Sequence, residues 1–202
     1  MTSRLLFLPG ASGNTRFWQP VADSLHYPGE RLHYGWPGFG ATPPDPAING
    51  IDDLVDMVVA DIDGPTALIA QSMGGVIAMR AALEKPELVT HLVLTVTSGG
   101  LDISDLGAED WRESFQTANA TFPRWFSDYR EDLTQRLAQI KLPVLLLWGD
   151  ADPISPVAVG RRLAAILPQA ELHVIPGGDH DLANALANVM TPLIDDYLTR
   201  LI

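Results

Sequence analysis

A single serine stands where an apolar run meets a glycine-rich turn. Ser72 follows residues 67–71 and precedes Met73-Gly74-Gly75, after which an alanine-rich helical pattern begins. Small residues around a serine favour a strained strand-to-helix turn that exposes its hydroxyl oxygen. The pattern therefore predicts a nucleophile elbow with Ser72 as the nucleophile. A serine at a helix start can also act only as an N-cap, and this short pattern alone leaves both interpretations open.

Two further apolar runs end in residues that could activate this serine. Residues 144–148 lead into Asp152, and residues 171–175 lead into His180. Because parallel strands end at one edge of a sheet, we expect the three side chains to meet there. In such a triad Ser72 attacks an acyl carbonyl, His180 transfers the proton, and Asp152 orients the imidazole.

The order of these motifs resembles the α/β-hydrolase superfamily, in its lipase/esterase-like branch. Members of this superfamily carry the serine, the acid and the histidine in this order along the chain. The resemblance rests on residues 8–13, 17–18 and 37–42 together with the three triad segments. It covers most of the chain, apart from about residues 99–139. It also implies that the chain begins at the third strand of the family sheet, as a minimal form.

The resemblance implies an oxyanion hole made by backbone amides. The N–H groups of Met73 and Ala11 are the implied donors. Two positions depart from the family pattern, because Pro9 stands where many members have histidine and Ala70 replaces the first glycine of the elbow. Alanine is nearly as small as glycine, and Pro9 is a neighbour of the implied donor. The departures therefore bear on the substrate class more than on the chemistry.

The turn after residues 144–148 offers two carboxylates as the acid of the triad. The resemblance favours Asp152, which lies in Gly-x-x-Asp and precedes Pro-Ile. Asp150 is expected to stabilise the loop instead. Asp179 and Asp181 flank the histidine and are too close in sequence to orient its ring easily.

Apolar runs alternate with helical patterns along most of the chain. Strands are expected at residues 4–8, 31–34, 66–70, 91–96, 144–148 and 171–175. Helices are expected at residues 17–25, 51–62, 75–83, 156–167 and 182–198. This alternation predicts an α/β fold with a doubly wound, mostly parallel sheet of about six strands. We expect a single domain spanning residues 1–202.

The alternation lapses at about residues 99–139, where aromatic residues gather. This stretch resembles the short helical cap that roofs the active site in relatives. Its aromatic side chains suit an apolar acyl or aryl pocket, and the pocket candidates are Trp111, Phe115, Trp125 and Phe126. Packing of the insertion onto the core is the alternative, because aromatic side chains dominate core burial.

Composition narrows the function classes. The chain has 202 residues, of which 47% are hydrophobic, enough for one substantial core. It has no cysteine, which excludes disulfides, thiol catalysis and thiolate metal sites. Its formal net charge of −12 argues against nucleic acid as a partner. Because the first residues do not resemble a signal peptide and no run reaches membrane-spanning length, we expect a cytoplasmic protein without a membrane partner.

Other titratable and glycine-rich patterns carry weaker signals. The remaining histidines lie in or beside predicted strands and are expected to be structural or on the surface: His26, His33, His91 and His173. A metal cluster of His173 with residues 179–181 is a minor alternative, because no zinc motif such as H-E-x-x-H occurs. Gly38-Phe39-Gly40 lacks the remaining glycine of a dinucleotide fingerprint, and no P-loop occurs. We therefore expect neither a metal nor a cofactor.

Three function hypotheses follow. The first is a cofactor-free serine hydrolase that cleaves a carboxylic ester or thioester of a small, mostly apolar acyl substrate through an acyl-enzyme. The second uses the same triad for C–C bond hydrolysis, a lyase step or perhydrolysis, because a fold does not fix a function. The third is a non-catalytic ligand-binding relative, which is disfavoured because such a protein need not retain all three triad residues. The sequence specifies neither the natural substrate nor the oligomeric state.

Overall fold

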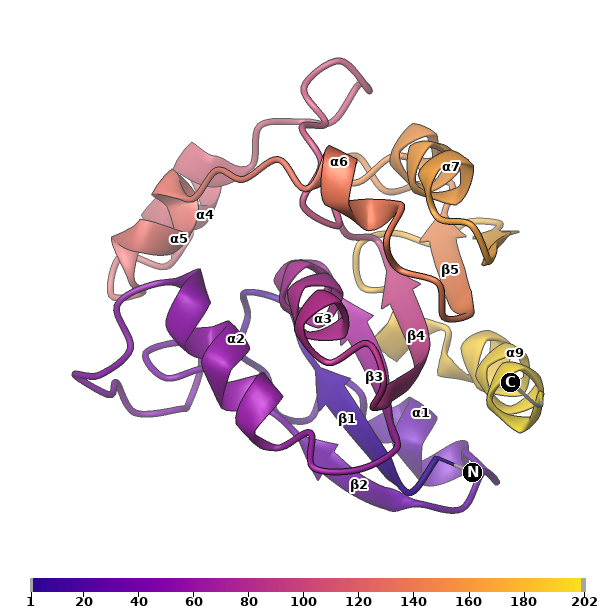
Figure 1. Ribbon diagram of the computed structural model, residues 1–202. Helices are drawn as coiled ribbons and strands as arrows, with labels where there is room; N and C mark the ends of the chain where they lie inside the picture. The colour runs from indigo at the N-terminus through magenta and orange to yellow at the C-terminus, as the bar shows by residue number, and fades with distance from the viewer. Residues whose placement is uncertain (1, 201–202) are drawn as a thin grey trace.

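Six parallel strands form one sheet in the computed structural model, which describes residues 2–200 (Figure 1). The strands are β1 (Arg4–Leu8), β2 (Glu30–His33), β3 (Thr66–Gln71), β4 (Val89–Thr95), β5 (Val144–Gly149) and β6 (Ala170–Ile175). The helices are α1 (Gln19–Ser24), α2 (Ile51–Ala60), α3 (Met73–Glu84), α4 (Arg112–Ala118), α5 (Arg124–Asp128), α6 (Thr134–Leu137), α7 (Val157–Ile166), α8 (Leu182–Ala185) and α9 (Ala187–Thr199).

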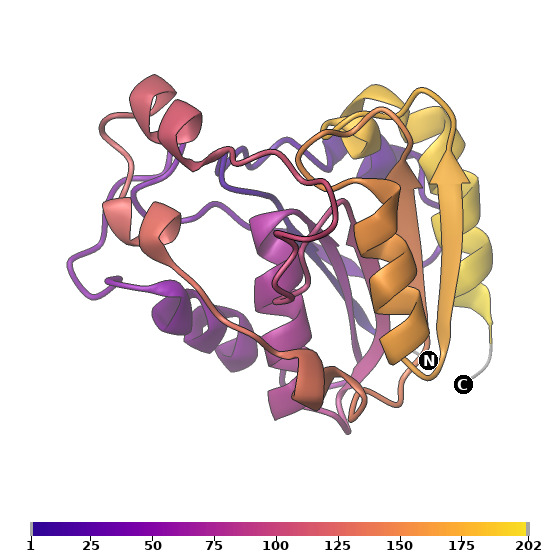
Figure 2. The same cartoon turned by 90° about the horizontal axis from the view of Figure 1, so that it is seen from above.

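The strand order is β2-β1-β3-β4-β5-β6, and every neighbouring pair is parallel. Helices α2, α3 and α7 cover one face of the sheet, and α1, α8 and α9 cover the other (Figures 1 and 2). The chain moves outward from β1 to β2 and then returns to place β3 on the other side of β1. The predicted doubly wound α/β fold is therefore confirmed, with its topological switch point between β1 and β3.

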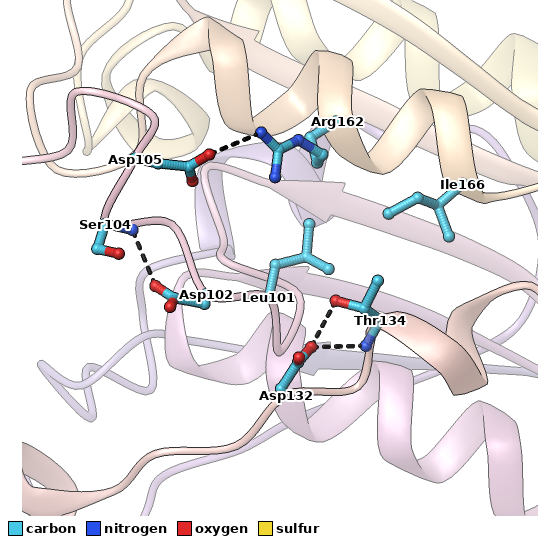
Figure 3. A pocket seen from close by; sticks show the side chains of 8 residues that line it. All are labelled: Leu101, Asp102, Ser104, Asp105, Asp132, Thr134, Arg162 and Ile166. Atoms are coloured by element: carbon cyan, nitrogen blue, oxygen red, sulfur yellow. Dashed lines mark hydrogen bonds and ion pairs between the residues drawn. The ribbon is translucent and has the colours of Figure 1, made fainter.

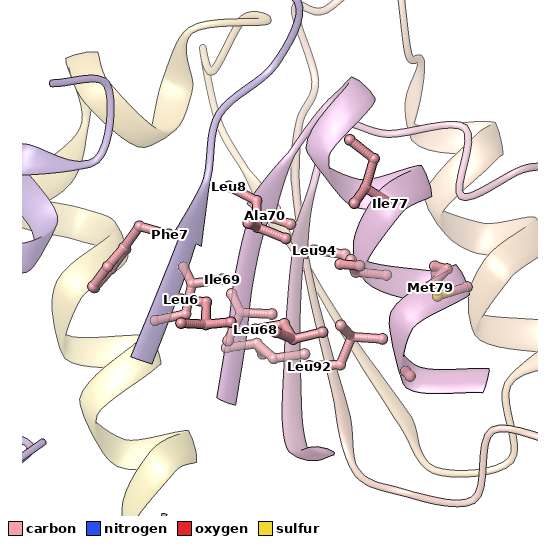
Figure 4. Close-up of a cluster of buried hydrophobic side chains, with 14 of the residues drawn as sticks. Leu6, Phe7, Leu8, Leu68, Ile69, Ala70, Ile77, Met79, Leu92 and Leu94 are labelled. Atoms are coloured by element: carbon pink, nitrogen blue, oxygen red, sulfur yellow. The ribbon is translucent and has the colours of Figure 1, made fainter. Parts of the chain in front are cut away.

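The core lies along the central strands, which are apolar over most of their length. Every residue of β3 and β5 is buried, as a strand covered by helices on both faces requires. Figure 4 shows Leu6, Leu68 and Leu92 on adjacent strands, packed beside one another under α3. Burying one such leucine side chain contributes about 1.5–3 kcal/mol, so these contacts fix the strand ends that carry the polar residues.

Several element boundaries differ from those predicted. Helix α3 begins at Met73 and not at Gly75 as predicted, because the turn at Ser72 leads directly into the helix. Strand β4 ends at Thr95, since Val96 has φ of +40°, which is incompatible with a strand. The helix predicted at residues 182–198 is divided at Leu186 into α8 and α9.

The segment at residues 99–139 holds the short helices α4, α5 and α6. Figure 2 shows α4 and α5 next to each other, at a distance from the sheet. Helix α4 has no buried residue, and α5 has only Phe126. Within residues 2–200, no helix is both long enough and apolar enough to cross a membrane.

Helix α3 approaches strand β1 very closely at Gly74. A Cβ atom at this position would lie 2.5 Å from the carbonyl oxygen of Leu8 and 2.6 Å from that of Pro9. Both contacts are with backbone, which cannot rotate away as a side chain can. The first turn of α3 therefore tolerates only glycine at this position.

We expect Gly74→Ala to lower the free energy of unfolding by about 1–3 kcal/mol, because the helix must move away from β1 to admit the methyl group. Urea denaturation measures this change. Gly64→Ala is the matched control, since a Cβ there would have Ser3 Oγ at 3.9 Å as its nearest atom. Equal effects of the two substitutions would contradict the close-approach argument.

Candidate active site

Ser72 stands at the turn between β3 and α3 with a strained backbone. Its φ is 52° and its ψ is −119°, a conformation that costs a residue other than glycine about 1–3 kcal/mol. Its side chain makes no capping hydrogen bond to α3. Instead, Ser72 Oγ lies 3.0 Å from His180 Nε2. The structure therefore places this hydroxyl beside a base, as the elbow interpretation expects, and not over the helix start.

His180 is held between the serine and a buried carboxylate. Its Nδ1 lies 2.8 Å from Oδ2 of Asp152, whose side chain is fully buried, whereas 26% of the His180 side chain is exposed. The other carboxylate oxygen, Asp152 Oδ1, accepts the N–H groups of Ile154 at 2.8 Å and Ser155 at 3.2 Å. These two donors fix the carboxylate, so that Oδ2 remains directed at the imidazole.

The neighbouring carboxylates make different contacts. Asp150 Oδ1 accepts the N–H of Gly177 at 2.7 Å, which ties the loop after β5 to the loop after β6. Asp181, next to the histidine, is exposed to solvent, although neighbouring residues partly shield its carboxyl group. Burial, followed by the nearby Asp179 carboxylate, raises the pKa of Asp181 above its ordinary value, and the charge of His180 opposes this rise. Of the four candidate carboxylates, which are those of Asp150, Asp152, Asp179 and Asp181, only that of Asp152 contacts the imidazole.

The loop after β1 runs past the elbow and is fixed by two buried tryptophans. The indole N–H of Trp18 donates to the carbonyl oxygen of Leu8 at 3.0 Å, and that of Trp36 donates to Pro9 at 2.9 Å. A Cβ on Gly10 would lie 3.0 Å from Ser72 Cβ, so the loop passes directly beside Ser72. The tryptophans thus orient the peptide groups that lead to Ala11.

The two predicted oxyanion donors come from either side of the switch point between β1 and β3. Ala11 follows β1, and Met73 is the first residue of α3 after β3. The first N–H groups of a helix have no acceptor within that helix, and the helix dipole makes this end favourable for negative charge. Ligands of open α/β sheets bind at such a switch point. The position suits an oxyanion that develops beside Ser72.

Gln71, which no motif in the sequence singles out, also positions the histidine. Its side chain is buried, and its Nε2 donates to the backbone carbonyl oxygen of His180 at 3.0 Å. Its Oε1 would lie 2.2 Å from a Cβ on Gly10, so the same side chain touches the oxyanion loop. Its position next to Ser72 was the only signal in the sequence, because Gly10 and His180, which it contacts, are distant along the chain.

The four candidate pocket aromatics pack mainly against one another and against Phe39. Trp111 stacks on Phe126 with ring centroids 5.0 Å apart, and Phe115 meets Phe126 edge-on at 5.5 Å. Trp125 meets Phe39 at 5.6 Å, and so connects α5 to the loop after β2. This aromatic cluster gathers the predicted residues, and their contact with a substrate stays a prediction.

A cavity of about 310 Å³ lies away from the triad, between the segment after β4 and helix α7 (Figure 3). Its polar lining is already engaged in local contacts, with Arg162 bound to Asp105 and the N–H of Ser104 donated to Asp102. No triad residue and none of the four pocket aromatics lines it. The candidate site at Ser72 is therefore separate from this cavity.

The remaining histidines lie apart from the triad. Burial lowers the pKa of His91, which contacts Tyr197, and of His33, which stacks on Phe7. The ring of His26 contacts Asp195, and His173 contacts Glu171. Across residues 2–200, no three His, Cys, Asp or Glu side chains are grouped so that they could hold a metal ion.

Two family models match adjoining parts of the chain. Residues 5–108, just over half of the chain, match the alpha/beta hydrolase family. Residues 116–186 match the family described as serine aminopeptidase, S33. The first match includes Ser72, and the second includes Asp152 and His180.

Individual relatives are similar over most of their length. A pimeloyl-(acyl-carrier protein) methyl ester esterase of Nitrosomonas europaea is 25% identical over 222 residues, covering 87% of this chain and 88% of the relative. A 2-hydroxy-6-oxononadienedioate/2-hydroxy-6-oxononatrienedioate hydrolase of Burkholderia vietnamiensis is 28% identical over 247 residues, covering 95% and 84%. The solved structure of a thermophilic esterase from Thermogutta terrifontis has a TM-score of 0.80 at 20% identity, covering 98% of this chain and 90% of that chain. This structural likeness shows a common fold.

Proposed function

The chain belongs to the alpha/beta hydrolase family, and we propose that it is a serine hydrolase that cleaves a carboxylic ester or thioester of a small, mostly apolar acyl group. The observation that carries this proposal is the contact of His180 with both Ser72 Oγ and Asp152 Oδ2, at 3.0 and 2.8 Å. Two hydrogen bonds on opposite nitrogens of one imidazole are the geometry of a base that is oriented by an acid.

In the first step, Ser72 Oγ forms a bond to the acyl carbon while its proton passes to His180 Nε2. The carbonyl oxygen gains the negative charge and is stabilised by the N–H groups of Met73 and Ala11. Asp152 holds Nδ1 in its protonated form, so that Nε2 has a free lone pair for the proton. The bond between the acyl carbon and the leaving oxygen or sulfur then breaks, and the leaving group receives the proton from His180.

In the second step, water repeats the attack on the acyl-enzyme. His180 removes a proton from the water as the oxygen of the water bonds to the acyl carbon, and the charge again forms in the oxyanion hole. The bond to Ser72 Oγ breaks, the proton returns to Oγ, and the carboxylic acid leaves. The reaction needs no cofactor and no metal.

A carbon–carbon hydrolase is the second candidate, supported by the relative from Burkholderia vietnamiensis. The compound in that relative's name has no ester bond, so its hydrolysis breaks a bond between carbon atoms beside a ketone. Assays on p-nitrophenyl esters and on a 2-hydroxy-6-oxo-dienoate separate the two candidates. Faster turnover of the esters supports the esterase proposal, and turnover of the dienoate alone favours the second.

Ser72→Ala should abolish ester hydrolysis, with a loss of about 10³-fold or more, and should prevent labelling by a fluorophosphonate. The fold should survive, because alanine fits where serine stands. Ser114→Ala, at an exposed serine on α4, is the control and should label normally. Labelling that persists in Ser72→Ala would refute the assignment of the nucleophile.

Asp152→Asn should lower kcat by about 10⁴-fold while leaving the loop intact. The amide oxygen can still accept the N–H groups of Ile154 and Ser155, but the amide nitrogen then faces His180 Nδ1. This donor forces the proton of the neutral imidazole onto Nε2, which can no longer accept the proton of Ser72.

Asp150→Asn is the matched control, because its amide oxygen can still accept the N–H of Gly177. It should change kcat by less than about tenfold. Steady-state kinetics at a pH where both variants are folded measures the difference. A larger loss of kcat in Asp150→Asn than in Asp152→Asn would assign the role of the triad acid to Asp150.

Trp125→Ala should change the preference among acyl chains, if the aromatic cluster borders the acyl group as we propose. The ratio of kcat/KM for octanoate and acetate p-nitrophenyl esters should shift by about tenfold, in the range expected for apolar pocket contacts. Thermal unfolding provides the comparison. An unchanged ratio together with a lower Tm would identify Trp125 as packing alone.

A further inference from the structure

A fully buried threonine lies directly beneath the strained turn of Ser72. Thr97 Oγ1 donates a hydrogen bond to the backbone carbonyl oxygen of Ser72 at 2.6 Å and accepts the N–H of Gly99 at 3.0 Å. The same carbonyl accepts the N–H of Gly75 at 2.9 Å. Neither Thr97 nor its hydroxyl has a role in the triad or in the oxyanion hole.

The threonine connects in turn to the loop that carries the acid. Ser155 Oγ donates to the backbone carbonyl oxygen of Thr97 at 3.3 Å and accepts the indole N–H of Trp148 at 3.2 Å. The N–H of Ser155 donates to Asp152 Oδ1 at 3.2 Å. A path of hydrogen bonds through the buried residues Thr97 and Ser155 therefore joins Ser72 to Asp152 without passing through His180.

The backbone immediately before Thr97 is strained, so the surrounding contacts must hold this position. Val96, immediately before it, has φ of +40°, which is a genuine outlier for a β-branched residue. The Thr97 side chain also lies over Gly75, where a Cβ would come within 2.5 Å of Oγ1. Strained residues persist only where their surroundings fix them, and they concentrate at functional sites.

We propose that Thr97 and Ser155 are positioning residues, here termed the Thr97–Ser155 brace, which keep Ser72 and Asp152 aligned on the two sides of His180. This inference rests on the proposed serine hydrolase function. The imidazole can bond to both partners only while the distance between them is fixed, and a displacement of about 1 Å at a reacting group can cost 10²-fold in rate. The brace fixes this distance through the end of β4.

The test compares two buried threonines of the same strand and its following turn. Thr97→Val keeps the shape of the side chain and removes the bond to Ser72. Thr95→Val removes a buried hydroxyl that donates to Ala70 at 3.4 Å and lies outside the brace. Thr97→Ser keeps the hydroxyl and removes only the methyl group. The readouts are the rate of fluorophosphonate labelling, the kcat and KM for a p-nitrophenyl ester, and Tm.

We expect Thr97→Val to slow labelling and to lower kcat by about tenfold with KM unchanged, because misalignment affects the reaction and not the acyl contacts. Thr95→Val and Thr97→Ser should stay within about threefold of the wild type. Equal rates in Thr97→Val and Thr95→Val, even with a lower Tm, would overturn the proposal.

Ser155→Ala provides a second test, and it decides the matter if Thr97→Val does not fold. This variant keeps the N–H that binds Asp152 and removes the hydroxyl that bonds to Thr97 and Trp148, so labelling should slow several-fold. Labelling at the wild-type rate would overturn the brace while leaving the proposed function intact. Absence of labelling in the wild type would instead refute the proposed function, and the brace with it.

Discussion

The strained turn at Ser72 is the constraint on which the rest of the site depends. Its positive φ costs about 1–3 kcal/mol, which the surrounding contacts must offset. The N–H of Ser72 donates to the carbonyl oxygen of Thr95 at 3.1 Å, and its own carbonyl is bound by Gly75 and Thr97. These contacts require that α3 lie close to β1 and β4, which explains the paired glycines after Ser72. These backbone contacts hold Ser72, the proposed nucleophile, in a partly exposed position.

Sheet topology supplies the remaining groups from distant parts of the chain. The loop with the proposed oxyanion donor Ala11 follows β1, Ser72 follows β3, Asp152 follows β5 and His180 follows β6, and all these strands run parallel. Their buried apolar side chains hold the strand ends in fixed relative positions. Asp152 is fully buried, and His180 reaches from the sheet edge to the partly exposed Ser72. Packing of the core therefore fixes the positions of Ser72, Asp152 and His180 relative to one another.

Sequence patterns predicted the elements whose signals are local. Apolar runs located all six strands, and glycines and polar residues at their ends marked Ser72, Asp152 and His180 as the residues that the structure brings together. The contacts of Trp36, Gln71 and Thr97 had no such signal, because each joins segments far apart in sequence and uses a side chain that is common in protein cores. The break at Leu186 was also missed, since apolar residues continue through it.

Helix α4 differs from the strands that precede Ser72 and Asp152 in how deeply its residues are buried. The triad stands on strands with buried neighbours, where a substitution creates a cavity or an unpaired polar group and costs several kcal/mol. Helix α4 has no buried residue, and its Phe115 packs against Phe126 of α5, which in turn contacts Phe39. Substitutions on α4 are therefore expected to leave the core and the strained turn intact, whereas Leu133 and Leu137 of the segment at residues 99–139 are buried in the core. If the aromatic cluster borders the acyl group as proposed, α4 can be reshaped for different acyl groups without disturbing the residues around the strained turn.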